Sequence, residues 1–465
     1  MKRENSVTQI DNYLESNMDR YLSELVELCA QPSISARKEG TQECAELVGR
    51  LLARHGLSVE RYETAGNPVL VGRAKGRSQR TLLCYNHYDV QPAEPLELWT
   101  SPAFEPTIRD GRIYARGSVD DKGQLYLHIK ALEAHLAVRG TLPVNVIVIA
   151  EGEEEVGSVN LEQFLEREQQ RLACDAVVIS DSCMFAPGIP SILSSLRGMA
   201  YVQIDVRGTN GDLHSGMYGG AVVNPAMALA RILATMHDSE GRVSIDGFYD
   251  HVKPFPDAVR AGMRALPHSD VELMHEVGVT ALGGEPGFTT LERLWTRPTC
   301  EVNGLLSGYT GEGAKTVLPA ISMAKVSFRL VPDQDPDDIV ALVRAHVARV
   351  TPAGVTATVT AMHGGRPWRA DLKGPIIDAG KRALTAAFGR EPVITGEGGS
   401  IPVVGDFERI LGAPVLLMGF GLPGENAHAP NEWISAENYR LGMRAAATLI
   451  DEFARASSRA NSPTL

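Results

Sequence analysis

The sequence lacks the features that mark secreted, membrane-spanning and nucleic-acid-binding proteins. Its six cysteines are scattered and form no CxxC pair, so we expect buried, reduced thiols. No apolar run is long enough to cross a membrane, and the first residues lead into a polar helix rather than a secretory signal. The net charge of -12 argues against nucleic acid or an anionic membrane surface as the main partner. We therefore expect a soluble, cytoplasmic protein.

The length and the order of apolar segments predict more than one domain. A chain of 465 residues is too long for a single core, so two domains are the first expectation and three the alternative. In the first part of the chain, short apolar runs alternate with amphipathic stretches, which is typical of a mostly parallel sheet covered by helices on both faces. The expected strands are residues 69–72, 81–85, 144–150 and 176–179. The expected helices are residues 124–138 and 161–172, after a helical region over residues 10–56.

The pattern changes after Arg197 and returns to its first style near residue 373. In between, expected strands at 200–206, 324–330 and 356–361 and helices at 225–236 and 336–349 leave room for a smaller α+β sheet domain. The first style resumes with helices at 374–388 and 436–456 and strands near 392–394 and 414–418. We therefore predict one α/β domain (1–198 and 372–465) that is interrupted by a second domain (199–371).

A run of glutamates follows the expected strand at 144–150. Glu151, Glu153, Glu154 and Glu155 stand within five positions, and uncompensated carboxylates are costly to bury at a strand end. Their partner could be a metal ion, an arginine or lysine side chain, or solvent. The segment alone leaves these alternatives open.

Other acidic and histidine residues share the same topological position. His87 and Asp89 follow the strand at 81–85, Asp181 follows the strand at 176–179, and His428 follows the strand at 414–418. Asp120 lies just before the helix at 124–138. Because the carboxyl ends of parallel strands meet in one crevice, we expect these side chains to converge.

Two imidazoles and several carboxylates form a mixed ligand set that suits Zn²⁺, with Mn²⁺ or Co²⁺ as alternatives. One histidine for each ion and one bridging aspartate would favour two ions about 3.5–4 Å apart. Such a pair binds a hydroxide between the ions and polarises a carbonyl. One carboxylate must then stay off the metals to accept the proton of the water and pass it to the leaving amine.

At these positions the sequence resembles the M20 family of di-zinc metallopeptidases, in particular its carnosinase-like cytosolic dipeptidases. The resemblance rests on HYDVQP (residues 87–92), GSVDDKG (117–123), EGEEEVGS (151–158) and GGSIP (398–402). These motifs extend over nearly the whole chain. The resemblance implies a homodimeric enzyme that hydrolyses dipeptides or short peptides with a free C-terminal carboxylate. It also implies that residues 1–198 and 372–465 form the catalytic domain and that residues 199–371 form a lid and dimerisation domain.

The resemblance also implies a role for each metal ligand. His87 and Asp181 would hold one ion. Glu155 and His428 would hold the other. Asp120 would bridge both ions.

The resemblance implies two further roles beside the metals. Asp89 would orient and polarise His87, and Glu154 would be the general base and then the general acid. Many members of the family have an apolar residue in place of Glu153. An inward-facing Glu153 would raise the pKa of Glu154 by like-charge repulsion, but we expect Glu153 to face solvent.

Most of the expected substrate-binding residues lie in the inserted domain, and Ser400 follows it in the sequence. His214, in DLHSGMYGG (212–220), resembles the family's dimerisation-domain histidine, which would reach into the active site of the partner subunit and stabilise the developing oxyanion. Arg329, in SFRLVP (327–332), would bind the C-terminal carboxylate of the substrate. Ser400 would add a hydroxyl donor to the same carboxylate. Thr316, in KTVLP (315–319), and Asn303 are further substrate-binding candidates.

The remaining histidines have other expected environments. His128 and His135 lie on a helix and are interpreted as solvated or satisfied core histidines. His363, before a pair of glycines, could line the cleft. The others lie in largely polar contexts and are predicted to be exposed: His55, His237, His251, His268, His275 and His346.

Two other functions remain open from the sequence. An N-acyl-amino-acid deacylase could use the same metal site, because it also cleaves an amide beside a carboxylate. A catalytically silent protein that kept the fold is the other alternative, although retention of every expected ligand and of Glu154 argues against it.

Overall fold

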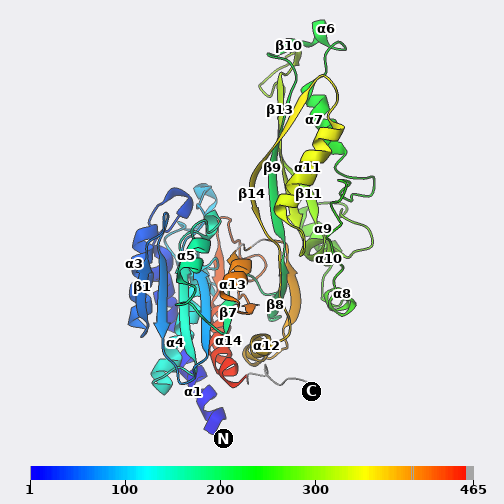
Figure 1. Ribbon diagram of the computed structural model, residues 1–465. Coiled ribbons are helices and arrows are strands. Elements are labelled where there is room, and N and C mark those ends of the chain that lie inside the picture. Colours follow the sequence, from blue (N-terminus) through cyan, green and yellow to red (C-terminus); the bar gives the residue numbers. More distant parts are fainter. Residues whose placement is uncertain (1, 400, 402, 457–465) are drawn as a thin grey trace. The chain divides into compact units, whose positions relative to one another are not determined.

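The computed structural model describes residues 2–399, 401 and 403–456 (Figure 1). The chain divides into two compact units. The first unit comprises Met1–Ser194, Ala370–Thr395 and Val403–Leu465. The second comprises Ser195–Arg369 and Gly396–Pro402. The sequence placed the insertion between residues 199 and 371 and did not indicate that residues 396–402 belong to the second unit.

The first unit is built on a six-stranded sheet, of which Figure 1 labels the strands β1 and β7. In spatial order its strands are β1 (Ser58–Tyr62), β2 (Val69–Ala74), β6 (Asn145–Glu151), β3 (Thr81–His87), β7 (Ala176–Ile179) and β17 (Val415–Leu417). The neighbours β6, β3, β7 and β17 pair in parallel, whereas β2 is antiparallel to both of its neighbours. The predicted mostly parallel sheet is therefore confirmed.

Helices cover both faces of this sheet, because the buried side chains of the strands alternate between two layers. Leu82 and Cys84 of β3 belong to the main hydrophobic core, which also contains side chains from α1 to α4, α12 and α14. Tyr85 of β3 faces the other way, and its ring lies 4.9 Å from that of Phe407 in α13. Strand β6 is buried at every residue after Asn145, and such burial on both faces gives a parallel strand its continuous apolar sequence.

The helices of the first unit overlap the predicted ranges, with one exception. They are α1 (Lys2–Ser16), α2 (Met18–Ala30), α3 (Thr41–Arg54), α4 (Lys122–Arg139), α5 (Leu161–Glu168), α12 (Pro375–Phe388), α13 (Val403–Leu411) and α14 (Ala436–Arg455). Gly140 ends α4 in a left-handed conformation, with φ 68° and its N–H bonded to the Leu136 carbonyl. The sequence did not predict α13.

Short strands in two small sheets also went unpredicted. One sheet has the order β18 (Trp433–Ser435), β5 (Arg112–Tyr114) and β4 (Thr107–Arg109). The other has the order β15 (Trp368–Arg369), β8 (Ser191–Leu196) and β16 (Val393–Glu397). Only the region of β16 was expected to be a strand.

The second unit contains a four-stranded antiparallel sheet with two helices on one face. The sheet order is β11 (Thr299–Ser307), β13 (Ile321–Leu330), β9 (Gly198–Arg207) and β14 (Thr356–Gly365). Alternate residues of β9 are buried, and they share a core with α7 (Pro225–Ala234) and α11 (Pro336–Val350). Each of these helices begins with a side-chain cap followed by proline, from Asn224 and Asp335.

The remaining elements of the second unit are short. They are β10 (Leu213–His214), α6 (Ser215–Tyr218), α8 (Asp257–Arg264), α9 (Asp270–Val277), α10 (Thr290–Thr296) and β12 (Val317–Leu318). The predicted α+β character of this domain is confirmed, but α8, α9 and α10 were not predicted in this Gly/Pro-richer stretch.

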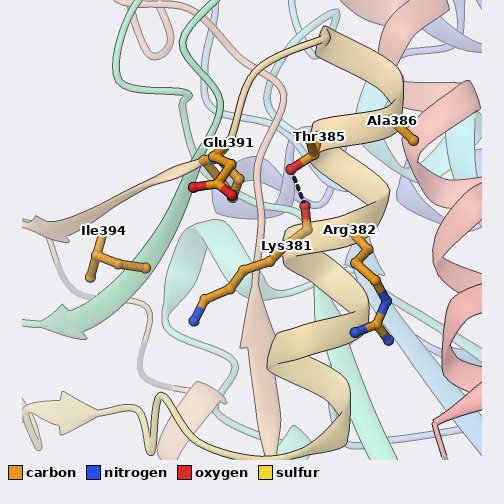
Figure 2. A pocket seen from close by; sticks show the side chains of 7 residues that line it. Lys381, Arg382, Thr385, Ala386, Glu391 and Ile394 are labelled. Atoms are coloured by element: carbon orange, nitrogen blue, oxygen red, sulfur yellow. Dashed lines mark hydrogen bonds between the residues drawn. The ribbon is translucent and has the colours of Figure 1, made fainter.

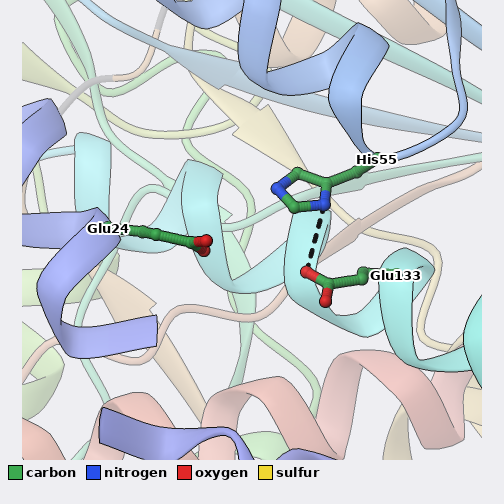
Figure 3. Close-up of side chains that lie close together, drawn as sticks. All are labelled: Glu24, His55 and Glu133. Atoms are coloured by element: carbon green, nitrogen blue, oxygen red, sulfur yellow. Dashed lines mark ion pairs between the residues drawn. The ribbon is translucent and has the colours of Figure 1, made fainter. Parts of the chain in front are cut away.

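His55 is buried, so the prediction that it is exposed was wrong. It is 7% exposed and its Nδ1 lies 3.1 Å from Oε2 of Glu133 (Figure 3). Lys130 Nζ lies 2.9 Å from His55 Nε2 and also bonds to Glu24 and Glu133. These two glutamates and His55 have the spacing of a metal site, but the Lys130 ammonium already supplies their cation. The prediction for His346 was also wrong, since it is 4% exposed and lies 2.9 Å from Thr235 Oγ1.

All six cysteines carry free thiols, as predicted. Cys29, Cys44, Cys84 and Cys300 are buried, whereas Cys174 and Cys183 are partly exposed. In the part of the chain that the structure describes, no helix is both long and apolar enough to cross a membrane.

Candidate metal centre

The predicted ligands of the first unit lie at the carboxyl edge of the main sheet. His87 is the last residue of β3, and Asp181 follows β7 by two residues. Glu155 lies in the short helix η3 (Glu154–Val156) after β6, and Gly157 ends this helix in a left-handed conformation, with φ 91°. His428 lies in the loop between β17 and β18. This edge therefore collects residues from distant parts of the sequence.

One cluster of ligand atoms forms around His87. Its Nε2 lies 3.1 Å from Asp120 Oδ1 and 3.7 Å from Asp181 Oδ1. The imidazole of His87 is fully buried. Burial alone would lower its pKa, but the hydrogen bonds to Asp120 and Asp181 raise that pKa well above its ordinary value.

A second cluster forms around His428. Its Nε2 lies 2.8 Å from Asp120 Oδ2 and 3.2 Å from Glu155 Oε2. These hydrogen bonds raise the pKa of His428 to about 10. Asp120 thus belongs to both clusters and turns one carboxylate oxygen to each.

The donor set fits two divalent cations. In each cluster the ligand atoms lie within 4.8 Å of one another. In the described part of the chain, Asp120, Asp181 and Glu155 pair with imidazoles rather than with a lysine or an arginine. A divalent cation at each position would neutralise the negative charge that these carboxylates bring together. Imidazole nitrogen and carboxylate oxygen are ligands that Zn²⁺, Mn²⁺ and Co²⁺ accept.

Asp89 is fully buried and contacts three groups around the clusters. Its Oδ1 lies 3.4 Å from His87 Nδ1, on the ring edge opposite the ligand nitrogen. Its two oxygens accept the backbone N–H groups of Glu154, at 3.2 Å, and Glu155, at 3.1 Å. The backbone carbonyl of Asp89 also lies 3.1 Å from His87 Nδ1. Asp89 is therefore placed to fix the orientation of the His87 ring.

Glu154 lies beside the clusters but belongs to neither. Its pKa is raised well above the ordinary value, first by burial and then by the neighbouring Asp181 carboxylate. A divalent cation nearby would oppose this effect and favour the ionised form.

Glu153 does not face solvent, so that prediction was wrong. It is 7% exposed, and its Oε2 accepts a 2.8 Å hydrogen bond from Asn160 Nδ2. A Cβ atom at Gly66 would lie 1.7 Å from Glu153 Oε1, so the glycine makes room for this carboxylate. Glu151 is also buried, and it accepts hydrogen bonds from Tyr85 and Ser158.

His214 lies exposed in the second unit, in the short strand β10. Its Nδ1 accepts a 3.0 Å hydrogen bond from the backbone N–H of Gly216. The neutral ring therefore carries its proton on Nε2, which makes Nε2 a hydrogen-bond donor. Thr316 is close to His214, because its carbonyl accepts the backbone N–H of Ser215 at 3.1 Å.

The other substrate-binding candidates occupy different positions. Arg329 is partly buried near the end of β13, where it pairs with Met199 of β9. Asn303 is exposed at an irregularity of β11, between Val302 and Gly304. Ser400 lies outside the described residues.

Within the second unit, His214 and Arg329 lie at opposite ends of the sheet. The β10–β12 pair adjoins the start of β13, since Ala320 N bonds to Asp212 Oδ1 and Ile321 pairs with Arg207. From residue 321 to residue 329 the strand extends for about 26 Å at roughly 3.3 Å per residue. One small substrate cannot span that distance.

Two buried acids that support the site were not assigned a role from the sequence. Asp121 Oδ2 accepts hydrogen bonds from Asn86 Nδ2, at 2.7 Å, and from the backbone N–H of His87, at 3.2 Å. Glu432 accepts backbone N–H groups on either side of Ser118, including that of Asp120. The position of Asp121 beside Asp120 was a signal for the first, whereas nothing in the sequence points to the second.

The histidines of α4 have satisfied core environments, consistent with one of the two interpretations. His128 Nε2 lies 2.8 Å from Ser180 Oγ, and His135 Nε2 lies 2.9 Å from the Ala447 carbonyl. Burial lowers the pKa of His128 to about 4. His363 is exposed on β14 and stacks on Tyr201, with ring centroids 5.0 Å apart.

A surface hollow of about 570 Å³ lies elsewhere in the first unit, between α12 and β16 (Figure 2). Its charged lining residues are Lys381, Arg382 and Glu391. Arg382 is already paired with Glu452, at 2.5 Å. None of the predicted site residues lines this hollow, so it is separate from the metal centre.

A parallel α/β sheet whose carboxyl edge carries histidines and carboxylates in two clusters is the arrangement of a metal-dependent hydrolase. A sequence model of the Peptidase family M20/M25/M40 matches residues 83–452. The chain therefore belongs to this family, and the predicted family and enzyme class are confirmed.

Relatives cover almost the whole chain. The Cys-Gly metallodipeptidase dug1 of Schizosaccharomyces pombe is 31% identical, over 97% of this chain and 99% of the relative. The Beta-Ala-His dipeptidase of Homo sapiens is 31% identical, over 83% of this chain and 78% of the relative. The crystal structure of the M20 family metallo-carboxypeptidase Sso-CP2 from Sulfolobus solfataricus superposes with a TM-score of 0.86, at 34% identity, over 94% of this chain and 99% of that one.

Proposed function

We propose that this protein hydrolyses the amide bond of dipeptides or short peptides with a free C-terminal carboxylate, using two divalent metal ions. The observation that carries the proposal is the position of Asp120 between two ligand clusters, one around His87 and one around His428. The relatives named above act on peptides, and two of them are named for dipeptides.

The ligand sets follow from the two clusters. His87 and Asp181 would hold one ion, and Glu155 and His428 the other. Asp120 would bridge them. When bound, the ions would activate a water molecule and polarise the carbonyl of the scissile amide. We propose Zn²⁺ as the native metal, with Mn²⁺ and Co²⁺ as alternatives, because the ligands suit all three.

Glu154 would move the proton. It lies beside the clusters without belonging to either, so its carboxylate is available to take a proton from the attacking water and deliver it to the leaving amine. Asp89 supports this role, because it holds the backbone of Glu154 and contacts His87.

The second unit would bind the substrate. Arg329 would pair with the C-terminal carboxylate, with Ser400 as a second donor to it, and Thr316 and Asn303 would contribute further contacts. His214 would stabilise the oxyanion, for which its Nε2 donor is suited.

We propose a homodimer in which His214 serves the active site of the partner. Since His214 and Arg329 lie at opposite ends of the sheet in one unit, a substrate that contacts both must receive them from different subunits. The second unit also exposes an apolar edge. Leu305 and Leu306 of the edge strand β11 are 62% and 57% exposed, and Met227 of the largely apolar helix α7 is 56% exposed.

The alternative activity, deacylation of N-acyl amino acids, uses the same chemistry but is not favoured by the relatives, which are named as peptidases. A cytoplasmic location is also part of the proposal, supported by the six free thiols.

A substrate panel with restored metals tests the proposed activity. The purified protein is stripped of metal and assayed on dipeptides, tripeptides and N-acyl amino acids with Zn²⁺, Mn²⁺ or Co²⁺. We expect metal-dependent cleavage of dipeptides, and faster cleavage of N-acyl amino acids would overturn the substrate assignment. Glu154→Gln should lower kcat by about 10²–10⁴-fold. Glu153→Gln is the matched control, because Glu153 is buried next to Glu154 but bonds to Asn160.

A further inference from the structure

Glu432 is a fully buried glutamate between two loops that carry proposed metal ligands. It lies immediately before β18, whose pairing with β5 aligns Trp433 with Tyr114. Its backbone carbonyl extends this pairing by accepting the N–H of Ala115 at 3.1 Å. The side chain of Glu432 therefore starts next to the loop that leads to Asp120.

Both oxygens of Glu432 are used by that loop. Oε1 accepts the backbone N–H groups of Val119, at 3.0 Å, and Asp120, at 3.1 Å. Oε2 accepts the backbone N–H of Gly117, at 2.9 Å, and Nη1 of Arg116, at 2.7 Å. Three of the four donors are backbone groups, so this carboxylate fixes the path of the chain and does more than neutralise an arginine.

The same residue is four positions from His428. Between β17 and β18 the chain takes left-handed conformations at Asn426, His428 and Asn431, so the loop has no regular secondary structure around the imidazole. Glu425 holds the other side of this loop, where its carboxylate accepts the N–H groups of Leu422, at 2.7 Å, and Ser435, at 2.9 Å.

We propose that Glu432 is a positioning residue that sets the separation between Asp120 and His428. It is joined to His428 through a short stretch of chain and to Asp120 by a hydrogen bond, although Asp120 and Glu432 are 312 positions apart. Through this link it holds the shared carboxylate where both ligand clusters can use it. The inference rests on the proposed metal centre.

A buried ion pair between Glu432 and Arg116 alone would not affect the position of Asp120. If Glu432 served only to neutralise Arg116, its removal would lower stability through the unpaired arginine and leave the ligand geometry unchanged. If it positions Asp120, its removal must weaken metal binding even in protein that remains folded. The two roles therefore differ in a measurement that does not depend on activity.

Metal affinity of two Glu432 variants separates these roles. Glu432→Gln introduces an amide NH₂ that faces backbone N–H donors. Glu432→Asp keeps the charge near Arg116 but draws the oxygens back by one methylene. Metal-free wild type and variants are titrated with Mn²⁺, and free Mn²⁺ is followed by electron paramagnetic resonance. We expect both variants to bind Mn²⁺ about 10–100-fold more weakly, which is the usual effect of losing a group that orients a ligand.

Glu425→Gln is the matched control. Glu425 is a buried glutamate of the same loop with two backbone partners, but it does not contact the Asp120 loop through its side chain. We expect this variant to melt at a lower temperature and to keep an Mn²⁺ affinity close to that of wild type. Thermal melting of all variants shows which remain folded at the titration temperature.

The outcomes are distinguishable. Wild-type affinity in folded Glu432→Gln or Glu432→Asp overturns the positioning role, and so does an equal loss of affinity in Glu425→Gln. Wild-type protein that fails to bind two Mn²⁺ ions instead overturns the proposed metal centre itself.

Discussion

The carboxylate of Asp89 accepts the backbone N–H of Glu154 at 3.2 Å. The same carboxylate lies 3.4 Å from the Nδ1 atom of His87. The proposed base and a proposed metal ligand are therefore held by one buried side chain, although His87 ends β3 and Glu154 follows β6.

The contacts of Asp89 predict the effect of Asp89→Asn. The amide keeps one acceptor oxygen, but its NH₂ group would face a backbone N–H or His87 Nδ1, so one of these contacts must be lost. We expect metal affinity or kcat to fall about 10–100-fold. Mn²⁺ titration and steady-state kinetics measure the two effects separately.

Asp378→Asn provides the control, because Asp378 is an exposed carboxylate on α12. It removes the same charge from the same unit and should leave both quantities unchanged. Wild-type kcat and metal affinity in Asp89→Asn would show that these contacts do not support the site.

Much of the ligand set could be predicted because the sequence shows where the buried strands end. Buried strands such as β3 and β6 appear as short apolar runs, and the polar residue after each run marks the carboxyl edge of the sheet. His87 and Glu155 were found in this way, and the family resemblance then gave each a role.

Contacts between segments that are distant in the sequence could not be predicted. Glu153 is buried because Gly66 and Asn160 make a place for it, and His55 is buried because Lys130 and Glu133 come from another helix. A polar sequence context indicates exposure only where no such partner exists. Glu432 mostly accepts hydrogen bonds from backbone N–H groups. Almost every residue type has this group, so the sequence does not indicate which residues Glu432 contacts.

Subunit mixing tests the role of His214 in the partner's active site. A His214→Ala chain retains Glu154, and a Glu154→Gln chain retains His214. If His214 acts on the partner, each heterodimer contains one complete site. We expect the mixture of two inactive proteins to recover about one quarter of wild-type activity at random assortment. Activity is measured after subunit exchange that is verified by native mass spectrometry.

The reverse arrangement is the control. When a chain that carries both substitutions is mixed with wild type, a heterodimer has no complete site if His214 acts on the partner. If His214 acts within its own chain, the wild-type chain of this heterodimer stays active. Activity in these heterodimers, or no recovery in the first mixture, would contradict a role for His214 in the partner's active site.

Arg329→Met tests recognition of the substrate carboxylate. Loss of a hydrogen-bonded charge costs about 1.5–3 kcal/mol, which is roughly a 10- to 150-fold loss of kcat/KM. We expect this loss for a dipeptide with a free carboxylate and little further loss for the same dipeptide as a C-terminal amide. Arg329→Lys, which keeps the charge but not the bidentate geometry, should fall in between. An equal loss on both substrates would place Arg329 away from the carboxylate.

The surroundings of His55 predict how stability depends on pH. Burial and the Lys130 ammonium lower the pKa of His55 to about 4, from the ordinary value of 6.5. Lys130 donates to His55 Nε2, and Nδ1 faces Glu133, so the folded state holds a neutral ring. The charged groups around this ring are Lys130, Glu133, Glu24 and Arg54.

In the unfolded chain, His55 binds a proton as the pH falls below 6.5. In the folded chain, it binds that proton only near pH 4. The contribution of His55 to stability is therefore complete above pH 6.5 and is lost as the pH falls toward 4. We expect His55→Gln to remove on the order of 2 kcal/mol of this pH dependence, measured by urea unfolding at steps from pH 7 to pH 4. His237→Gln, at an exposed position, should follow the wild-type profile. A His55→Gln profile parallel to wild type would show that the ring titrates alike in both states.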